Sequence, residues 1–277
     1  MKLISFGDKI QEGVYSDIHS VFEKVVNFNF SNDLVVSVVS EEIGNGPFNI
    51  VVSNIDFSLI RSIKFFNSIE INGKLFDKSN IQQYDSGIPK INFKHLDKNW
   101  EFIAQKLKYS PEKSLAFLLH PEKKMEFSTT FDTQLIKKIE TGVENIFNVN
   151  NIVSGLKSIK GLGYGLTPSG DDFISGVLTS LNLLEIKNNN SYIELKNKIF
   201  ETVRGENRIS NNSFYISKEN LYSEKLKNLL VALSEQNKNE IENAIRNYID
   251  IGETSGADFL TGLYLMYEKN KECKIYN

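Results

Sequence analysis

Two nine-residue segments of the chain match without gaps and begin 86 residues apart: Ser169–Val177 reads SGDDFISGV and Ser255–Leu263 reads SGADFLTGL. In each, a serine and an aspartate three residues later have the spacing of a helix-capping box, and hydrophobic residues follow at helical intervals. Each also places a glycine, Gly176 or Gly262, four residues after its aspartate, on the same helical face. Glycine inside a helix costs about 1 kcal/mol relative to alanine, so matched glycines indicate close backbone contact. We therefore expect the two helices to pack together, with their N-termini converging on one pocket.

The hydrophobic pattern of the first half of the chain is typical of β-strands. Leu34–Val39 and Phe48–Val52 are short β-branched runs, and Asn72-Gly73 inside Ser68–Phe76 predicts a type I′ hairpin. We also expect an edge strand around Ile91 and Phe93, after Pro89. In Tyr15–Phe28, hydrophobic residues recur at helical spacing and predict an early helix.

From about residue 130 the hydrophobic period becomes helical. Five amphipathic stripes predict helices, and the polar run Lys187–Ser191 predicts a surface loop. The stripes run through Leu135–Phe147, Ile152–Ile159, Phe173–Leu181, Leu226–Leu233 and Ile241–Ile249. The sequence therefore predicts an α+β protein, with a β-rich N-terminal domain over residues 1–128 and a mainly α-helical C-terminal domain over residues 129–277.

The charge and composition exclude several classes of protein. A net charge of −3 and a pI near 5.8 give no basic excess for nucleic acid, and no apolar run is long enough to span a membrane. The single cysteine, Cys273, can form no internal disulfide, and the N-terminus lacks the apolar core of a signal peptide. We expect a cytoplasmic protein. Its three histidines, His19, His95 and His120, lack the spacing of a zinc site.

The segment Gly161–Asp172, GLGYGLTPSGDD, is the predicted functional site. Glycines leading into a helix N-terminus expose backbone N–H groups where the helix dipole favours an anion, such as phosphate or a carboxylate. Asp171 and Asp172 would repel an anion, so we expect them to hold a divalent cation, to accept N–H bonds from an amide or carbamoyl group, or to transfer a proton. Ser169 and Asp172 can equally be ordinary capping residues, because both recur in the second copy. The glycine run and Asp171 do not recur: Ala257 stands in place of Asp171.

Two arginines are further candidates for binding an anion. Arg204 and Arg208 flank a polar turn and can bind an anionic substrate, or they can be solvated surface residues. The chain has no Gly-x-Ser-x-Gly motif and Cys273 has no evident partner, so the sequence does not favour covalent catalysis by serine or cysteine.

GLGYGLTPSGDDFISG, followed by GETSGADFLTG, resembles the family of AllH-type subunits of oxamate carbamoyltransferase. VYSDIHSVF (Val14–Phe22) and IGNGPFNIVV (Ile43–Val52) resemble it as well. The resemblance implies a subunit of a complex in purine (allantoin) catabolism that converts oxalurate and phosphate to oxamate and carbamoyl phosphate. The implied partners are a small anionic substrate and other subunits of a hetero-oligomeric complex. One departure is Glu253, where many relatives are expected to have histidine.

Together, motif and resemblance define the expected site. Asp171 and Asp172 are expected to be catalytic. The residues expected to bind substrate are Gly163, Gly165, Thr167, Ser169, Gly170, Asn207, Ser210, Thr254, Ser255 and Asp258. No cofactor is identified, and Mg²⁺ is the candidate if Asp171 and Asp172 hold a metal. Two alternatives stay open: a non-catalytic ligand-binding or regulatory subunit, and a magnesium-dependent enzyme that binds phosphate or a nucleotide.

Overall fold

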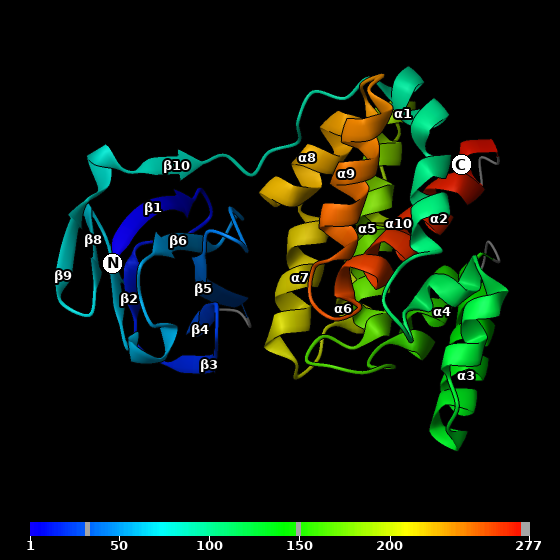
Figure 1. The fold of residues 1–277 in the computed structure, drawn as a ribbon, viewed down its shortest axis with the longest axis horizontal. Helices are drawn as coiled ribbons and strands as arrows, with labels where there is room; N and C mark the ends of the chain where they lie inside the picture. Colours follow the sequence, from blue (N-terminus) through cyan, green and yellow to red (C-terminus); the bar gives the residue numbers. More distant parts are fainter. Residues whose placement is uncertain (31–33, 148–150, 273–277) are drawn as a thin grey trace. The chain divides into compact units, whose positions relative to one another are not determined.

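The computed structural model describes residues 1–30, 34–147 and 151–272 (Figure 1); Cys273 lies outside them. The chain divides into two compact units. The N-terminal unit comprises residues 1–88 and 221–227, and the helical unit comprises residues 89–220 and 228–277. The predicted boundary at residue 128 therefore falls inside the helical unit, because residues 89–128 pack with the later helices.

The N-terminal unit contains two β-sheets. The six-stranded sheet has the order β10-β1-β6-β5-β4-β3, in which β1 pairs with β10, and β5 with β6, in parallel. The four-stranded sheet has the antiparallel order β2-β7-β8-β9. The strands are β1 (Lys2–Gly7), β2 (Gly13–Tyr15), β3 (Ile18–Phe22), β4 (Val25–Phe30), β5 (Leu34–Ser40), β6 (Asn49–Ser53), β7 (Ile63–Phe65), β8 (Ser68–Ile71), β9 (Lys74–Asp77) and β10 (Gln82–Tyr84).

One hydrophobic core joins the two sheets. It takes buried residues from the six-stranded sheet, such as Phe6, Val38 and Ile50, and others from the four-stranded sheet, such as Phe65 and Ile69. The rings of Phe6 and Phe65 meet edge to face with their centroids 5.5 Å apart. The predicted β-rich N-terminal part is confirmed.

The structure confirms the hairpin but not the early helix. Asn72 and Gly73 have φ values of 50° and 82°, as a type I′ turn requires. The predicted helix over Tyr15–Phe28 is wrong, since β3 and β4 form an antiparallel hairpin there and β4 also pairs along β5. Its hydrophobic residues fit a helical spacing, but pairing along β5 buries Val26 and Phe28 completely, while Val21 and Phe22 of β3 stay exposed.

The helical unit begins where an edge strand was predicted. The strand around Ile91 and Phe93 is wrong: the Asn92 side chain accepts a hydrogen bond from His95 N–H and caps α1. The helices are α1 (Phe93–Asn99), α2 (Glu101–Leu107), α3 (Thr130–Ile146), α4 (Ile152–Ile159), α5 (Ser169–Asn188), α6 (Ile193–Val203), α7 (Arg208–Lys218), α8 (Glu224–Leu233), α9 (Lys238–Ile249) and α10 (Ser255–Glu272). Short 3₁₀ helices lie at Phe57–Leu59, Lys78–Asn80, Leu115–Leu118 and Pro121–Glu126.

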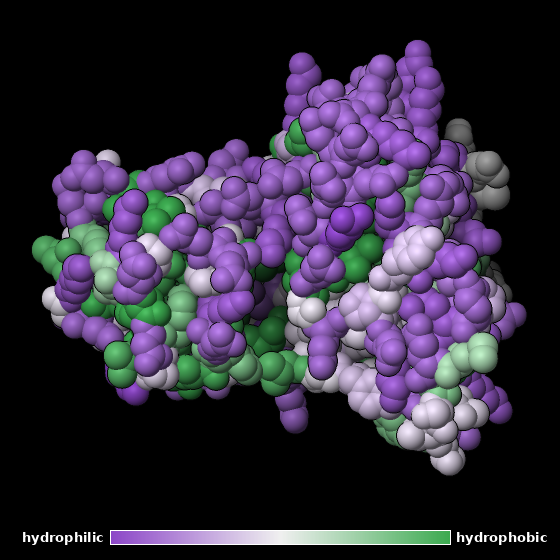
Figure 2. All heavy atoms as spheres, in the orientation of Figure 1, coloured by the Kyte–Doolittle hydropathy of each residue, from purple (hydrophilic) through white to green (hydrophobic). Residues whose placement is uncertain are grey.

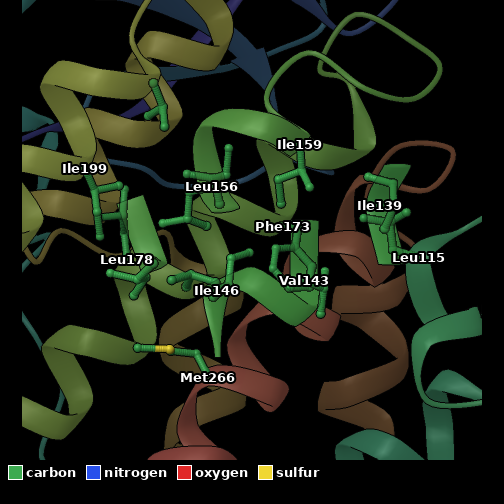
Figure 3. Packing of buried hydrophobic residues seen from close by; sticks show 14 of the residues in the cluster. Leu115, Ile139, Val143, Ile146, Leu156, Ile159, Phe173, Leu178, Ile199 and Met266 are labelled. Carbon is green, nitrogen blue, oxygen red and sulfur yellow. The ribbon is translucent and has the colours of Figure 1, made fainter. Parts of the chain in front are cut away.

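Helix α5 lies at the centre of the helical unit and is buried along almost its whole length. It extends two residues into the predicted loop at Lys187–Ser191 and ends at Asn188, followed by the C-cap Asn189, whose φ is 50°. Phe173 and Leu178 of α5 pack against α3, α4 and α6, as Figure 3 shows. A helix that is hydrophobic on nearly every side is expected at such a central position.

The outer surface of the helical unit is mostly hydrophilic in the view of Figure 2, whereas green hydrophobic side chains are more frequent on the N-terminal unit. Val14, Leu59 and Leu75 of the N-terminal unit are each at least 59% exposed. No helix in the described part of the chain is both long and apolar enough to cross a membrane.

Candidate functional site

The glycine-rich segment forms an irregular turn between α4 and α5. Gly161, Gly163 and Gly165 have φ values of 72°, 120° and 86°, whereas the residues between them have negative φ. Alternation in the sign of φ can turn successive N–H groups towards a common side, as in an anion-binding nest. Gly163 is also sterically required, because a Cβ there would lie 2.6 Å from Ser169 N. The predicted glycine turn at the start of a helix is therefore present.

The backbone of this turn has unused hydrogen-bond donors. The N–H groups of the five consecutive residues Gly163–Thr167 donate to no other described residue. Tyr164 is 39% exposed and Leu166 is 64% exposed, so this part of the turn faces solvent. A run of free N–H groups next to a helix N-terminus is a favourable site for an anion.

Two side chains hold the ends of the turn. Asp171 Oδ1 accepts a hydrogen bond of 2.7 Å from Gly161 N–H, and Asn207 Nδ2 donates one of 2.8 Å to the Leu166 carbonyl. Asn207 also caps α7, accepting from Ile209 and Ser210 N–H. Asp171 and Asn207 thus have a positioning role in the turn.

The middle of the turn is held by a cluster that the sequence did not predict. The Tyr164 hydroxyl donates a short hydrogen bond to Asp132, a buried residue in the first turn of α3. Lys113 Nζ lies 3.3 Å from the other oxygen of Asp132 and 5.2 Å from the centroid of the Tyr164 ring. The Tyr164 hydroxyl and the Thr129 N–H group hold the pKa of Asp132 well below its usual range, so Asp132 stays ionised at neutral pH.

We expect Tyr164→Phe to loosen the turn without unfolding the chain. The variant lacks a hydrogen bond to an ionised carboxylate, so exchange of the two hydrogen-bonded amides of the turn, those of Gly161 and Leu162, should become about tenfold faster. Hydrogen exchange followed by mass spectrometry measures this change. Tyr109→Phe is the control, because Tyr109 is 78% exposed and its hydroxyl has no hydrogen bond to a described residue. Equal exchange rates in wild type and Tyr164→Phe would show that Tyr164 does not hold the turn.

The repeated motif corresponds to a repeated structure. In each copy a helix, a loop and a long buried helix follow one another: α4 with α5, and α9 with α10. Gly170 N–H donates to Leu162 O at 2.8 Å, and Gly256 N–H donates to Ile251 O at 3.0 Å. The loop of the first copy is longer, and the glycine run lies within it. The glycine turn is therefore an elaboration of one copy of a shared unit.

Helices α5 and α10 pack at the two matched glycines, as predicted. A Cβ on Gly176 would lie 2.1 Å from Phe259 O, and one on Gly262 would lie 2.2 Å from Phe173 O. At the N-termini, Thr167 Oγ1 and Ser255 Oγ lie 2.9 Å apart. The N-termini of the two helices thus converge.

The predicted capping box is wrong for α5. Pro168 occupies the N-cap with no side-chain cap, and Ser169 is the first helical residue. The serines instead act across the two copies: the Ser169 hydroxyl lowers the pKa of Asp258, and the Ser255 hydroxyl lowers that of Asp172. Thr167 assists at Asp172 and Thr254 at Asp258. The motif builds one reciprocal cluster rather than two separate caps.

Burial is the dominant influence on the two aspartates of this cluster. Asp258 is fully buried, which raises its pKa to about 7, although its Oδ1 accepts a 2.5 Å hydrogen bond from Leu115 N–H. Burial also raises the pKa of Asp172 well above its usual range, and the nearby charge of Asp258 adds to the effect. A carboxyl group with a pKa of about 7, such as that of Asp258, can hold or release a proton near neutral pH.

Asp171 lies in a different environment from Asp172. Burial raises its pKa, while the Ser210 hydroxyl, Gly161 N–H and the charge of Lys160 lower it. Lys160, at the end of α4, also approaches Gly205, where a Cβ would lie 2.1 Å from its Nζ. Gly205 is held in turn by Asn211, whose side chain bonds its N–H at 2.9 Å and its carbonyl at 2.6 Å. The sequence had not singled out Lys160 or Asn211.

Two alternatives that the sequence left open concern Arg204 and a metal ion. Arg204 is exposed and pairs with Glu201 at 3.0 Å, as a solvated surface arginine would. Within residues 1–30, 34–147 and 151–272, no group of three or more His, Cys, Asp or Glu side chains is arranged to hold a metal ion.

The comparisons with known families agree with this division of the chain. Residues 159–267, which span both copies of the motif, match the family described as oxamate carbamoyltransferase subunit AllH. Residues 2–85 match the AllH family N-terminal domain. These matches identify the class as a subunit of a carbamoyltransferase, and the word subunit implies a complex with other subunits. The chain belongs to the AllH family. No curated protein and no solved structure matches it significantly.

Proposed function

We propose that this chain binds the small anionic substrate of an oxamate carbamoyltransferase complex at the glycine turn. The observation that carries the proposal is the run of five free N–H groups at Gly163–Thr167, beside the N-terminus of α5. Phosphate or the carboxylate of oxalurate fits these donors, since both are compact anions. The pathway would be the purine-degradation route that the family resemblance implies.

In the proposed reaction, a phosphate oxygen attacks the carbamoyl carbon of oxalurate. The carbon–nitrogen bond to the oxamate moiety breaks, and that nitrogen takes up a proton to give oxamate and carbamoyl phosphate. Free N–H groups of the turn would neutralise the attacking phosphate or stabilise the developing oxyanion. Asp172 would supply the proton, because burial raises its pKa and so favours its protonated form.

Asp171 has a supporting role in this proposal. Its carboxylate is 2% exposed and bonds Gly161 N–H, so it fixes the start of the turn. Asn207 contributes in the same way from α7 by its bond to the Leu166 carbonyl, whereas Ser210 of α7 lowers the pKa of Asp171. In this proposal, residues of the glycine turn present backbone N–H donors to the substrate, and residues such as Asn207 hold that turn in place.

The test is to assay carbamoyl phosphate formation from oxalurate and phosphate, with the full chain alone and with its partner subunits. Gly163→Ala should reduce phosphate affinity and activity by at least about tenfold, since the new Cβ meets Ser169 N and the φ of 120° is strained. Gly73→Ala is the matched control, because it introduces the same class of backbone strain in the β8–β9 hairpin.

Three results would contradict parts of the proposal. If Gly163→Ala bound phosphate as tightly as wild type, the glycine turn would not be the phosphate-binding site. If the complex containing Asp172→Asn were fully active, Asp172 would not be the proton donor, and the chain would be a ligand-binding subunit without a catalytic role. Stabilisation by ATP that depends on Mg²⁺, without any effect of oxalurate, would favour a nucleotide-dependent enzyme instead.

A further inference from the structure

Two buried carboxyl oxygens at the converging helix N-termini have unused acceptor capacity. Oδ2 of Asp172 and Oδ2 of Asp258 accept no hydrogen bond from another described residue. The two residues are only 7% and 0% exposed, respectively. Buried polar atoms in proteins are normally paired, because an unpaired one costs about 1–3 kcal/mol. Two such atoms from matching positions of a repeated motif require an explanation.

The surroundings of these oxygens contain few spare donors. Asp258 already uses Oδ1 to accept from Leu115 N–H, and its Oδ2 has no hydrogen bond although the Ser169 and Thr254 hydroxyls lie close to this carboxyl group. Thr167 and Ser255, the hydroxyls nearest to Asp172, are 2.9 Å from each other, so one of them donates to the other. The cluster therefore offers more acceptor sites than the chain itself fills.

The chemistry of a matching ligand follows from this excess of acceptors. An ionised carboxylate of this pair would repel an anion, whereas an N–H donor would be attracted, because a carboxyl group keeps an acceptor oxygen even when it is protonated. A primary amide carries two N–H donors on one nitrogen and can therefore address two acceptors at once. We expect a single nitrogen between the two helices to reach both aspartates, because α5 and α10 supply one each and Asp258 lies near enough to raise the pKa of Asp172.

We propose that Asp172 and Asp258 together bind the amide nitrogen of a carbamoyl or ureido ligand whose anionic end lies on the glycine turn. This inference rests on the proposed function and adds how the chain recognises the uncharged amide end of the ligand. Thr167 belongs to both the anion site and the amide site. Its N–H is the last in the run of free N–H groups, and its hydroxyl lowers the pKa of Asp172. Asp258 joins Asp172 in the pair, whereas Asp171 is engaged with Gly161.

Oxamate and oxalate are suitable probes, because they differ by an amide in place of one carboxylate. Isothermal titration at neutral pH would measure their binding to the full chain, alone and in the complex with its partner subunits. We expect wild type to bind oxamate at least about tenfold more tightly than oxalate. Asp172→Asn and Asp258→Asn should each weaken oxamate binding by at least about tenfold, while phosphate affinity stays the same or rises.

Asp250→Asn, at the end of α9, is the control, because Asp250 is exposed and has no side-chain hydrogen bond to a described residue. Circular dichroism and melting curves would establish that each variant is folded. The wild-type preference needs no variant, so the inference stays testable even if one substitution prevents folding.

The outcomes separate this inference from the proposed function. If wild type binds phosphate but does not prefer oxamate to oxalate, or if both Asn variants keep wild-type oxamate affinity, only the amide inference is overturned. If neither phosphate nor oxamate binds the chain or its complex, the proposed function fails and the inference fails with it.

Discussion

Gly176→Ala is expected to lower the free energy of unfolding by at least about 3 kcal/mol, a large effect for the addition of one methyl group. The new Cβ would lie 2.1 Å from Phe259 O and 2.7 Å from Leu263 N. Both atoms belong to the backbone of α10, so no side chain can rotate away and the two helices must separate. In an unhindered helix the same substitution would stabilise by about 1 kcal/mol, so the clash reverses the usual sign.

Urea unfolding followed by circular dichroism measures this effect. Gly262→Ala should behave in the same way, because its Cβ would lie 2.2 Å from Phe173 O. The double variant should cost less than the sum of the two, since a single separation of α5 from α10 relieves both clashes. Gly13→Ala is the control, because the nearest atom to its Cβ is a Tyr15 ring carbon 3.9 Å away.

Unchanged or increased stability of Gly176→Ala would contradict the close crossing of α5 and α10. The same variant also tests how the site is assembled. Separating the helices moves Asp172 away from Asp258, so oxamate affinity should fall even where the chain remains folded. Phosphate binding depends on the turn and should be less affected.

The helix crossing could be predicted from the sequence because glycine has few other reasons to occur inside a helix. The matched positions of Gly176 and Gly262 therefore indicated contact between two segments 86 residues apart. Local turn chemistry was similarly informative at Asn72-Gly73. In contrast, the hydrophobic residues of Tyr15–Phe28 fit two periods, and only pairing of β4 with β5 decides between them.

The candidate site was predictable in its position but not in its connections. The glycine run and the repeated motif are visible as residue types at fixed spacing. The partners that hold them are not, because Tyr164 and Asp132 are 32 residues apart and no spacing rule joins them. The Ser-x-x-Asp pattern was interpreted as a cap within each helix. Because the N-termini converge, each serine acts on the aspartate of the other copy.

Asp258→Asn is expected to remove a loss of stability that wild type shows as the pH rises from about 4 to about 7. Burial raises the pKa of Asp258 from 3.8 to about 7, so the folded chain holds this proton more tightly than the unfolded chain does. Below about pH 4 both states are protonated, and the folded state keeps its full advantage. Between the two pKa values only the unfolded state ionises, so stability falls by about 1.4 kcal/mol per pH unit, or about 4 kcal/mol in all.

The measurement is the difference in unfolding free energy between Asp258→Asn and wild type, from urea titrations across this pH range. Taking the difference removes the opposite contributions of aspartates with lowered pKa, such as Asp132. Asparagine keeps an acceptor for Leu115 N–H and does not ionise. The variant should therefore gain stability relative to wild type as the pH rises. The gain includes a contribution from Asp172, because removing the charge of Asp258 lowers the pKa of Asp172. A difference in unfolding free energy that does not change with pH would mean that Asp258 ionises at its ordinary pKa. Burial would then not raise the pKa of this carboxyl group.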